Sequence, residues 1–392
     1  MADFIPYGRQ DINEEDINAV VEVLRSPYLT TGPKVAEFEK AVAKKTGAPH
    51  AVAVSSGTAA LHLAMLAAGI GAGDEVLVPT TSFLASANCI LYAGAQPVFV
   101  DSVADGFNLD LDDAERKLTK KTRAIIAVDF AGQPLDHDRL RTFAKKHGLL
   151  FIEDAAHALG ATNQGRPIGS LADMTILSFH PVKLITTGEG GMILTTEASL
   201  AKRLRLLRHH GIDVDVQTRD AQHSWMYDMT ELGFNYRLSD IQCALGISQL
   251  KRLEAFIDRR GEIAEIYNQA FQGNPFLNIP PAGPETDRHA WHLYIVRLRL
   301  DRLKISRDGV FKELREEGIG AHVHYRPIHL HPFYQKLGFQ PGLCPNAERT
   351  FQTILTLPLY PAMRETEIRR VIETVNETLG KHATKPVPVV HG

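Results

Sequence analysis

The sequence predicts an α/β protein, with a doubly wound, mostly parallel sheet followed by a smaller α+β part. Strand-like and helix-like segments alternate as far as about residue 210, an order typical of parallel sheets whose strands are joined by helices. Long helical patterns then occupy 238–272, and a Pro/Gly-rich stretch at 273–284 separates them from a strand, helix, strand order. With 392 residues and 44% hydrophobic content, the chain can bury a large core.

The expected elements follow the chain in order. Apolar runs bounded by turn residues predict strands near 51–54, 75–78, 97–100, 123–130, 149–154, 173–179 and 191–195. Periodic segments predict helices between most of them, including 57–68, 110–118, 136–147 and 198–208. In the C-terminal part we expect strands at 290–299 and 320–325 around a helix at 308–317, and a loose tail from Lys381 to Gly392. We therefore divide the chain into a large domain, 1–250, and a small domain, 251–392.

Charge and cysteine usage exclude several classes of protein. The 43 basic and 46 acidic residues leave a net charge of −3, which predicts no general attraction to nucleic acid or to an anionic membrane. Cys89, Cys243 and Cys344 are widely spaced, so we expect neither a disulfide framework nor a zinc ribbon. The first residues lack a basic segment followed by an apolar one, and no run of about 18 apolar residues occurs. We therefore expect a cytoplasmic protein without a signal peptide or a membrane span.

One lysine stands between an apolar strand and a glycine-rich turn. The strand reads Met174-Thr175-Ile176-Leu177, Ser178-Phe179-His180-Pro181-Val182-Lys183 follows it, and Gly188-Glu189-Gly190-Gly191 ends the turn. Burial disfavours an ammonium, so an amine held there is a better nucleophile than a surface lysine and can form a Schiff base. The alternative is a solvated lysine at a strand end, which is the more common situation.

A carboxylate ends the preceding core strand. The run from Leu149 to Glu153 is apolar up to its last residue, which places Asp154 at the carboxyl end of a strand, where open α/β sheets bind ligands. A carboxylate there needs a cation, and the protonated ring nitrogen of pyridoxal phosphate would supply one. A helix-capping or ion-paired aspartate is the alternative.

A third segment combines a short strand, a turn and a helix-forming run. Ser56, Gly57 and Thr58 stand at the turn, where small residues let the backbone approach an anion and free amides at a helix start attract phosphate. Ordinary helix capping explains the same residues. We find neither Gly-x-x-x-x-Gly-Lys-Ser/Thr nor a convincing Gly-x-Gly-x-x-Gly between a strand and a helix, which disfavours the common nucleotide-binding motifs.

These three segments, in this order, resemble the fold-type I pyridoxal-phosphate enzymes, and specifically the sugar aminotransferases of the DegT/DnrJ/EryC1/StrS family. The resemblance covers nearly the whole chain. Further blocks that are similar to the family are Pro79–Asn88, Gly233–Ala244 and Val323–His329. The resemblance implies a fold-type I PLP-dependent transferase with pyridoxal 5′-phosphate as its cofactor.

The resemblance also implies roles for individual residues. Lys183 matches the Schiff-base lysine, Asp154 the partner of the pyridine nitrogen, and His157 the residue beside the cofactor's phenolic oxygen. The other matched cofactor positions are the phosphate-binding Gly57, Thr58 and Ser178, the stacking aromatic Phe83, and Asn235, which reaches the phosphate in the neighbouring subunit. Substrate contacts are implied for Tyr7, His180, His329 and Arg237. The match of Asn235 thus implies a homodimer with shared active sites. Without the resemblance, core packing is the simpler interpretation of Phe83, and a turn is the simpler interpretation of Asn235.

Within the family, the His-Pro-Val-Lys form of the lysine motif is similar to the UDP-4-amino-4,6-dideoxy-N-acetyl-β-L-altrosamine transaminases of pseudaminic acid synthesis. The resemblance implies L-glutamate as amino donor and UDP-2-acetamido-2,6-dideoxy-β-L-arabino-4-hexulose as acceptor, aminated at C4. GDP-perosamine-type enzymes share some of these features and stay an alternative. Leu184 departs from the group, much of which has His there. The sequence does not fix the sugar, the nucleotide base or the face of amination.

Histidine is frequent, at 17 residues, and His322-x-His324 with His329-x-His331 could be interpreted as a zinc cluster. No nearby Cys and no His-Glu-x-x-His supports a metal, so we expect none. The resembling family instead has a histidine near His329 in its sugar site.

The mechanism that the resemblance implies is a two-stage transfer. An amino acid displaces Lys183 from the cofactor, and the released amine moves a proton between the substrate carbon and the cofactor's C4′, leaving a keto acid. The keto sugar then reacts through the same steps in reverse order and gains an amine at C4. A pyridoxamine-dependent sugar dehydratase of the same fold has His in place of this lysine, so Lys183 argues against it. A non-catalytic protein that binds a sugar nucleotide or a metal is the other open class.

Overall fold

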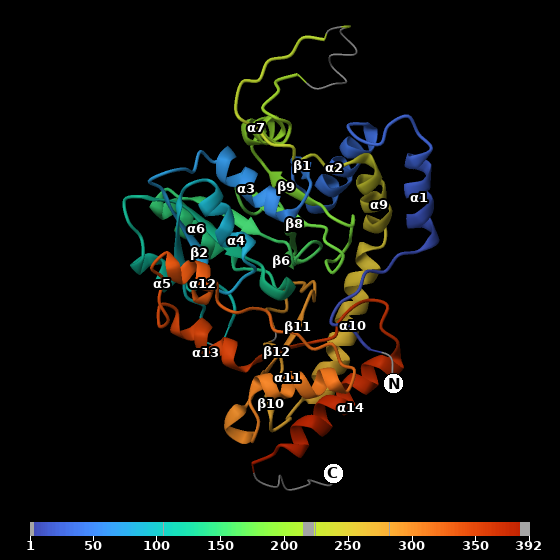
Figure 1. The fold of residues 1–392 in the computed structure, drawn as a ribbon, viewed down its shortest axis with the longest axis vertical. Coiled ribbons are helices and arrows are strands. Elements are labelled where there is room, and N and C mark those ends of the chain that lie inside the picture. The colour runs from blue at the N-terminus through green and yellow to red at the C-terminus, as the bar shows by residue number, and fades with distance from the viewer. Residues whose placement is uncertain (1–3, 105, 215–222, 224, 282, 385–392) are drawn as a thin grey trace.

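The computed structural model describes residues 4–104, 106–214, 223, 225–281 and 283–384. A seven-stranded sheet with helices on both faces forms the upper part of Figure 1, and a three-stranded sheet with α11 (Arg307–Glu316) and α14 (Glu365–Lys381) forms the lower part. The predicted α/β architecture with a smaller C-terminal α+β part is therefore confirmed. None of the described helices is long and apolar enough to cross a membrane.

The large sheet has the strand order β1-β9-β8-β5-β4-β2-β3. Its strands are β1 (His50–Val54), β2 (Glu75–Pro79), β3 (Gln96–Val100), β4 (Thr122–Val128), β5 (Leu150–Asp154), β8 (Met174–Ser178) and β9 (Gly191–Thr195). Only β9 runs antiparallel to both of its neighbours, and the other adjacent pairs are parallel. A separate two-stranded sheet pairs β6 (Thr162–Asn163) with β7 (Arg166–Pro167). The carboxyl ends of β4, β5 and β8 consequently meet at one edge.

Successive side chains along each strand of the large sheet point to opposite faces, and helices cover both faces. Val52 and Val54 face one core, which also contains Leu61 of α3, whereas Ala51 and Ala53 face another core, which contains Phe38 of α2. The helices of this part are α1 (Glu14–Leu24), α2 (Pro33–Thr46), α3 (Gly57–Ala67), α4 (Ala85–Tyr92), α5 (Leu111–Arg116), α6 (His137–His147), α7 (Ala198–Arg208) and α9 (Asp240–Leu250).

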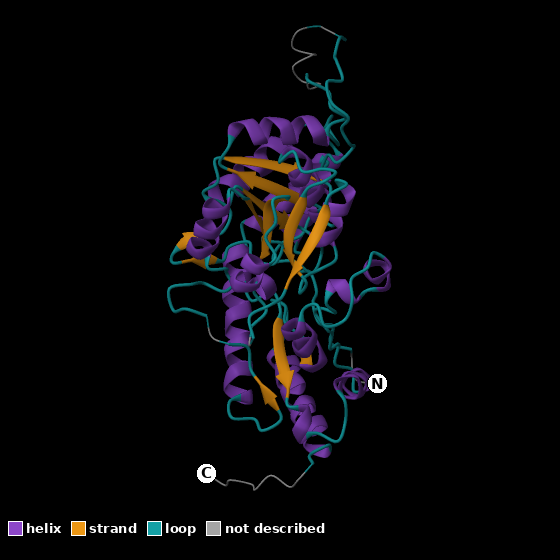
Figure 2. Ribbon diagram, turned by 90° about the vertical axis from the view of Figure 1, so that its left-hand side faces the viewer, coloured by secondary structure: helices purple, strands orange, loops and turns teal. Residues whose placement is uncertain are grey.

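The C-terminal part has its own core around an antiparallel sheet. Its strands, in spatial order, are β10 (Leu277–Asn278), β11 (Tyr294–Leu298) and β12 (Ile354–Leu357), and its remaining helices are α10 (Leu253–Phe271), α12 (Pro332–Lys336) and α13 (Pro345–Thr353). In Figure 1, α10 extends from the large part into the C-terminal part, and its first residues pack in the core around Phe38 while its last ones pack in the C-terminal core. Figure 2 shows the strands of the two parts one above the other, with helices around them. Ile5 packs in the same C-terminal core and bridges to Ile319. The domain division at residue 250 stays a prediction.

Four expected elements differ in detail. The helical pattern at 238–272 is two helices, α9 and α10, separated at Lys251 and Arg252. The expected strand at 123–130 ends at Val128, because a 3-10 turn with Ala131 at φ 59° follows. The segment 320–325 makes only the isolated bridge His322↔Thr356, and the strand in that place is β12. Helix α14 reaches Lys381, and most of the tail that we expected to be loose, 385–392, lies outside the described residues.

Candidate active site

The register of the large sheet brings three predicted segments to one edge. Gly191 of β9 pairs with both Val54 of β1 and Ser178 of β8, so the turn that follows β1 lies next to Ser178. Asp154 of β5 pairs with Ile176 of β8, one strand further along. Segments separated by more than 100 residues thus converge where the parallel strands end.

The loop that carries Lys183 is held by hydrogen bonds that begin and end on the sheet. Phe179 donates its amide to Gly190 O at 2.9 Å and accepts from the amide of Thr187 at 3.0 Å, and the amide of Lys183 donates to His180 O at 2.8 Å. Lys183 itself is half-buried. Burial lowers the pKa of its amine to about 8, against the opposing attraction of Asp154. A substantial fraction of the amine is therefore neutral near pH 8, which makes Lys183 a competent nucleophile and base.

Asp154 lies buried across from this amine, with 5% of its surface exposed. One carboxylate oxygen accepts from Ser86 Oγ at 2.6 Å and the other from the amide of Ala156 at 3.2 Å. Burial raises the pKa of Asp154, while these two donors and the charge of Lys183 oppose the rise. No described cationic side chain makes an ion pair with it, so this carboxylate can still accept a cationic partner within the site.

The start of α3 carries unused backbone donors. Ser56 Oγ caps the helix by accepting from the amide of Ala59 at 3.0 Å, so the helix-capping interpretation of Ser56 holds. The amides of Gly57 and Thr58 make no hydrogen bond to the described chain. A Cβ at Gly57 would lie 3.1 Å from the Cβ of Ser178, so glycine lets the turn approach that side chain closely. Two free amides and a hydroxyl at a helix start can bind an anion.

Aromatic rings form the walls of the site. Phe83 exposes 55% of its surface, and its ring lies 6.0 Å from that of Tyr325. His157 is 4% exposed and is surrounded by the rings of Phe130, His292 and Tyr325. Burial and the nearby charge of Lys183 hold the pKa of His157 well below its usual range, so its imidazole is neutral.

The predicted substrate contacts are dispersed. The ring of Tyr7 packs on His322 at 5.1 Å and on His324 at 5.2 Å, and His180 is exposed on the loop before Lys183. His329 is fully buried, with Nδ1 2.6 Å from Thr80 Oγ1 and Nε2 2.9 Å from Glu348. Both of its nitrogens are therefore used, and this placement does not agree with a sugar contact. Among the described residues, the three potential metal-ligating side chains that lie within 4.8 Å of one another are Asp129, His137 and Glu153, and they include none of the four histidines considered for a zinc cluster.

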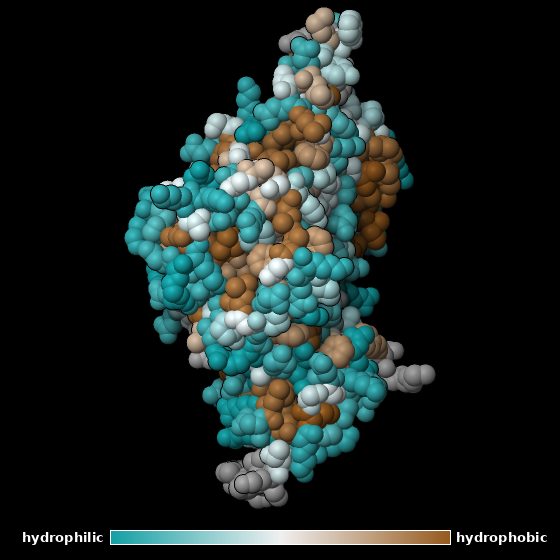
Figure 3. Space-filling view, turned by 60° about the vertical axis from the view of Figure 1, so that its left-hand side comes forward, coloured by the Kyte–Doolittle hydropathy of each residue, from teal (hydrophilic) through white to brown (hydrophobic). Residues whose placement is uncertain are grey.

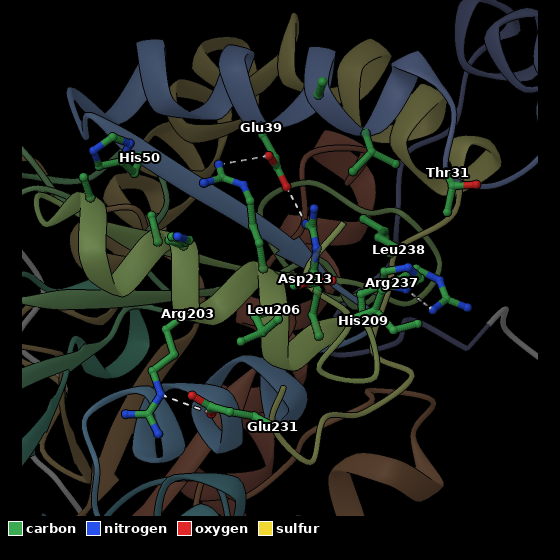
Figure 4. A pocket seen from close by; sticks show the side chains of 18 of the residues that line it. Thr31, Glu39, His50, Arg203, Leu206, His209, Asp213, Glu231, Arg237 and Leu238 are labelled. Carbon is green, nitrogen blue, oxygen red and sulfur yellow. Dashed lines mark hydrogen bonds and ion pairs between the residues drawn. The ribbon is translucent and has the colours of Figure 1, made fainter. Parts of the chain in front are cut away.

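Asn235 and Arg237 lie elsewhere, beside the end of α7. Asn235 is exposed and bridges to His209, whose Nδ1 is 2.7 Å from Arg237 Nη1. Arg237 lines a groove of about 1140 Å³ between α2, α7 and the segment 230–238. Figure 4 shows the ion pairs of this groove, including Arg203 with Glu231. None of the described residues around Lys183 lines the groove.

Sequence reasoning missed three residues of the site. Ser86, which bonds Asp154, and Tyr325, which faces Phe83 and His157, both lie inside blocks that were singled out for their resemblance. The position of Ser86 and Tyr325 inside these blocks could have identified them as site residues. His292 lies in a strand-like segment with nothing to distinguish it, so the sequence carried no signal for it.

Comparison with known proteins supports this arrangement. The chain is 36% identical to a putative sugar aminotransferase, Spr1654 from Streptococcus pneumoniae, in its PMP form, with a TM-score of 0.91 over 96% of this chain and 99% of that one. It is 31% identical to Helicobacter pylori PseC, described as an aminotransferase involved in the biosynthesis of pseudoaminic acid, with a TM-score of 0.89 over 96% and 100% of the two chains.

Sequence relatives agree with the structural ones. The spore coat polysaccharide biosynthesis protein SpsC of Bacillus subtilis is 42% identical over 377 residues, which are 95% of this chain and 97% of the relative. The profile of the DegT/DnrJ/EryC1/StrS aminotransferase family matches residues 10–376. The chain therefore belongs to this family of pyridoxal-phosphate-dependent sugar aminotransferases.

Proposed function

We propose that this aminotransferase moves an amino group from L-glutamate to C4 of a nucleotide-linked 4-keto-6-deoxy sugar. The observation that carries the proposal is the pairing of a lysine whose pKa burial lowers to about 8 with a buried carboxylate, Asp154, at one edge of the sheet. An amine that is both reachable and partly neutral is what transamination requires of its base.

The residues of the site fit pyridoxal phosphate. Asp154 is a buried carboxylate without an ion-pair partner in the described chain, which suits a protonated pyridine nitrogen. The free amides of Gly57 and Thr58, with Ser178 close by, suit the phosphate. The exposed ring of Phe83 suits stacking on the pyridine face. We assign His157 to the side of the phenolic oxygen, since its neutral ring can donate one hydrogen bond.

When bound, the cofactor supplies a carbonyl that condenses with amines and a ring that delocalises an electron pair. The chain's own residues do the rest. Lys183 Nζ would accept the proton from the substrate carbon and later release it, which requires the neutral amine that burial favours. Asp154 would hold the pyridine nitrogen, and its carboxylate would stabilise a positive charge on that nitrogen. The same two residues serve both half-reactions.

For the acceptor we propose UDP-2-acetamido-2,6-dideoxy-β-L-arabino-4-hexulose. The likeness to PseC over almost the whole chain, at 31% identity, supports this choice. The aromatic and imidazole rings of Tyr7, His322 and His324 offer flat surfaces and hydrogen-bonding atoms near Lys183 for such a sugar. Cytoplasmic location is part of this proposal and is supported by three buried, unpaired cysteines.

We further propose a homodimer in which Asn235 completes the partner's site. Asn235 and Arg237 lie on the groove beside α7 and away from Lys183 in the same chain. Apolar side chains in the part of the chain that precedes them are widely exposed: Trp225 by 82%, Met229 by 65% and Leu232 by 78%. Exposed apolar surface of this kind is typical of an interface. The face seen in Figure 3 also carries brown apolar patches among hydrophilic side chains.

An acceptor panel tests the proposed reaction. Purified protein with L-glutamate is offered UDP-, GDP- and dTDP-linked 4-keto-6-deoxy sugars, and the amino sugar and 2-oxoglutarate are measured together. We expect the highest kcat/KM with the UDP-linked N-acetylated sugar. A clear preference for a GDP-linked sugar would replace this acceptor by a perosamine-type one. Formation of no amino sugar, with no cofactor uptake, would instead support a non-catalytic binding protein.

A further inference from the structure

His157 has no hydrogen bond to the described chain that could fix its ring. Its Nδ1 is buried without a partner, so of the two nitrogens Nε2 is the one that faces open space. A histidine in an active site usually has one nitrogen anchored by a carbonyl or a carboxylate, which sets the orientation and the tautomer of the ring. Among the residues that the structure describes there is no such anchor, so the orientation of His157 comes from packing.

The ring that packs closest on His157 is His292. Their centroids are 4.3 Å apart with an angle of 38° between the planes, whereas Phe130 and Tyr325 lie at 6.0 Å and 6.4 Å. His292 is also 4% exposed, and its Nδ1 is likewise buried without a partner. The two rings come from different parts of the fold, because His157 follows β5 and His292 directly precedes β11.

The backbone around this ring pair is tightly constrained. Gly132 has a φ of 93°, and a Cβ at this position would lie 2.9 Å from His157 O and 3.0 Å from His292 N. Only glycine lets the two histidine segments approach each other across residue 132. The amides of Ala290 and Leu293 donate to Gly132 O at 2.9 Å and Ala131 O at 3.2 Å, so they attach the His292 segment to the same turn.

A buried arginine holds the His292 segment from the other side. Arg260 of α10 is 1% exposed, and its Nη1 donates to the carbonyl oxygens of Trp291 at 3.3 Å, His292 at 3.4 Å and Leu359 at 2.9 Å. Burial, together with the positive charges of Lys183 and Arg260, keeps the pKa of His292 well below its usual range. His292 is therefore a neutral ring that is fixed by its backbone.

We propose that His292 is a positioning residue for the transamination: its ring fixes the orientation of the His157 imidazole, and thereby the hydrogen bond that His157 Nε2 offers to the phenolic oxygen of the cofactor. The inference rests on the proposed role of His157. A hydrogen bond donated to that oxygen weakens its attraction for the proton on the neighbouring imine nitrogen. Loss of the orientation should therefore raise the pH at which the bound cofactor loses this proton.

The test compares His292→Ala with His292→Phe, which keeps a flat ring and removes both nitrogens. Each variant is loaded with pyridoxal phosphate, and the visible absorbance band is titrated with pH while the dissociation constant of the cofactor is measured separately. For His292→Ala we expect an upward shift of the titration midpoint and a cofactor dissociation constant about tenfold higher. For His292→Phe we expect both quantities to stay within about twofold of wild type.

Two further variants keep the test decisive. Gly132→Ala should reproduce the shift of His292→Ala, because its Cβ separates the two histidine segments without touching either ring. His289→Asn is the matched control: it removes a ring of the same segment that stacks on Trp291 at 4.0 Å, but keeps an acceptor for the Trp291 amide, which now donates to His289 Nδ1 at 2.8 Å, and it should titrate like wild type. Folding of each variant is checked by its melting temperature.

Several outcomes would overturn the proposal. A folded His292→Ala protein with the midpoint and dissociation constant of wild type would do so, as would a His292→Phe protein as strongly shifted as His292→Ala. An equal shift in His289→Asn would also contradict it. If instead the protein were not a transaminase, the result would differ from all of these, because wild-type protein would then show no visible cofactor band at all.

Discussion

At the scale of single residues, the chemistry depends on two side chains whose ordinary protonation states are altered by burial. The amine of Lys183 becomes partly neutral because its pKa falls to about 8. Burial raises the pKa of the Asp154 carboxyl, and Ser86, the Ala156 amide and Lys183 oppose that rise. Each of these opposing influences can be removed by a single substitution.

We expect Lys183→Ala to lose more than about a thousandfold in transamination rate while keeping its fold, because no other atom can both bond the cofactor and move the proton. Steady-state assay with L-glutamate and a keto sugar measures the loss, and circular dichroism checks the fold. Lys145→Ala, which removes an exposed lysine of α6, is the control and should keep full activity. Substantial turnover by Lys183→Ala would exclude the mechanism.

We expect Asp154→Asn to lower kcat on the order of a hundredfold, because a neutral amide cannot favour the protonated pyridine ring. Ser86→Ala removes only one hydrogen bond to the same carboxylate, so its loss should be smaller, about tenfold. The two variants are compared in one assay at saturating donor. If Asp154→Asn worked within about twofold of wild type, the pairing with the ring nitrogen would be wrong.

At the scale of elements, strand positions followed from sequence because each core strand is a short apolar run ended by turn residues. Asp154 and Ser178, the last residues of β5 and β8, and Gly57 at the start of α3 were all placed correctly in this way. The strand β12 was missed, since four residues directly after α13 carry no periodicity of their own. Contacts between distant segments, such as His157 with His292, could not be predicted because only the tertiary fold creates them.

One buried ion pair joins α6 to β5 next to the site. His137 Nε2 contacts Glu153 Oε1, and both side chains are fully buried. The Glu153 partner raises the pKa of His137 and His137 lowers that of Glu153, in both cases against desolvation. Each charge therefore compensates the other inside the core.

This ion pair predicts a specific pH dependence of stability. The raised His137 pKa gives stability that is complete below pH 6.5 and is lost as the pH rises through the folded value, and the lowered Glu153 pKa gives stability that is complete above pH 4.5 and is lost as the pH falls. His137→Met should therefore cost about 3–5 kcal/mol between these values. Urea unfolding across this range measures it, and the double variant His137→Met/Glu153→Gln should recover part of the loss. Equal stability of wild type and His137→Met near pH 5.5 would contradict the charged pair.

At the scale of the whole molecule, the two parts of the fold meet at the active site. The exposed groove beside α7 suggests that a second subunit completes this active site. Arg237 Nη1 lies 2.7 Å from His209 Nδ1 and faces the groove beside α7, whose described lining residues do not include Lys183. In the proposed homodimer, the partner subunit would account for this position and for the exposed side chains of Trp225 and Leu232.

Subunit exchange tests the shared site. Asn235→Asp places a negative charge where we propose the partner's cofactor phosphate, so its homodimer should bind cofactor poorly. Mixed with inactive Lys183→Ala chains, it should form heterodimers in which one site carries both changes and the other carries neither, and activity should return. A fully active monomer in sedimentation at assay concentration would refute the shared site.

The most direct test of the whole mechanism is to find which lysine bonds the cofactor. Holoprotein is reduced with borohydride, which fixes pyridoxal phosphate to any lysine bonded to it, and the digested peptides are analysed by mass spectrometry. We predict the pyridoxyl group on the peptide that contains Lys183, with loss of the visible absorbance. A modified lysine elsewhere, or no modified peptide in protein that has taken up cofactor, would contradict it.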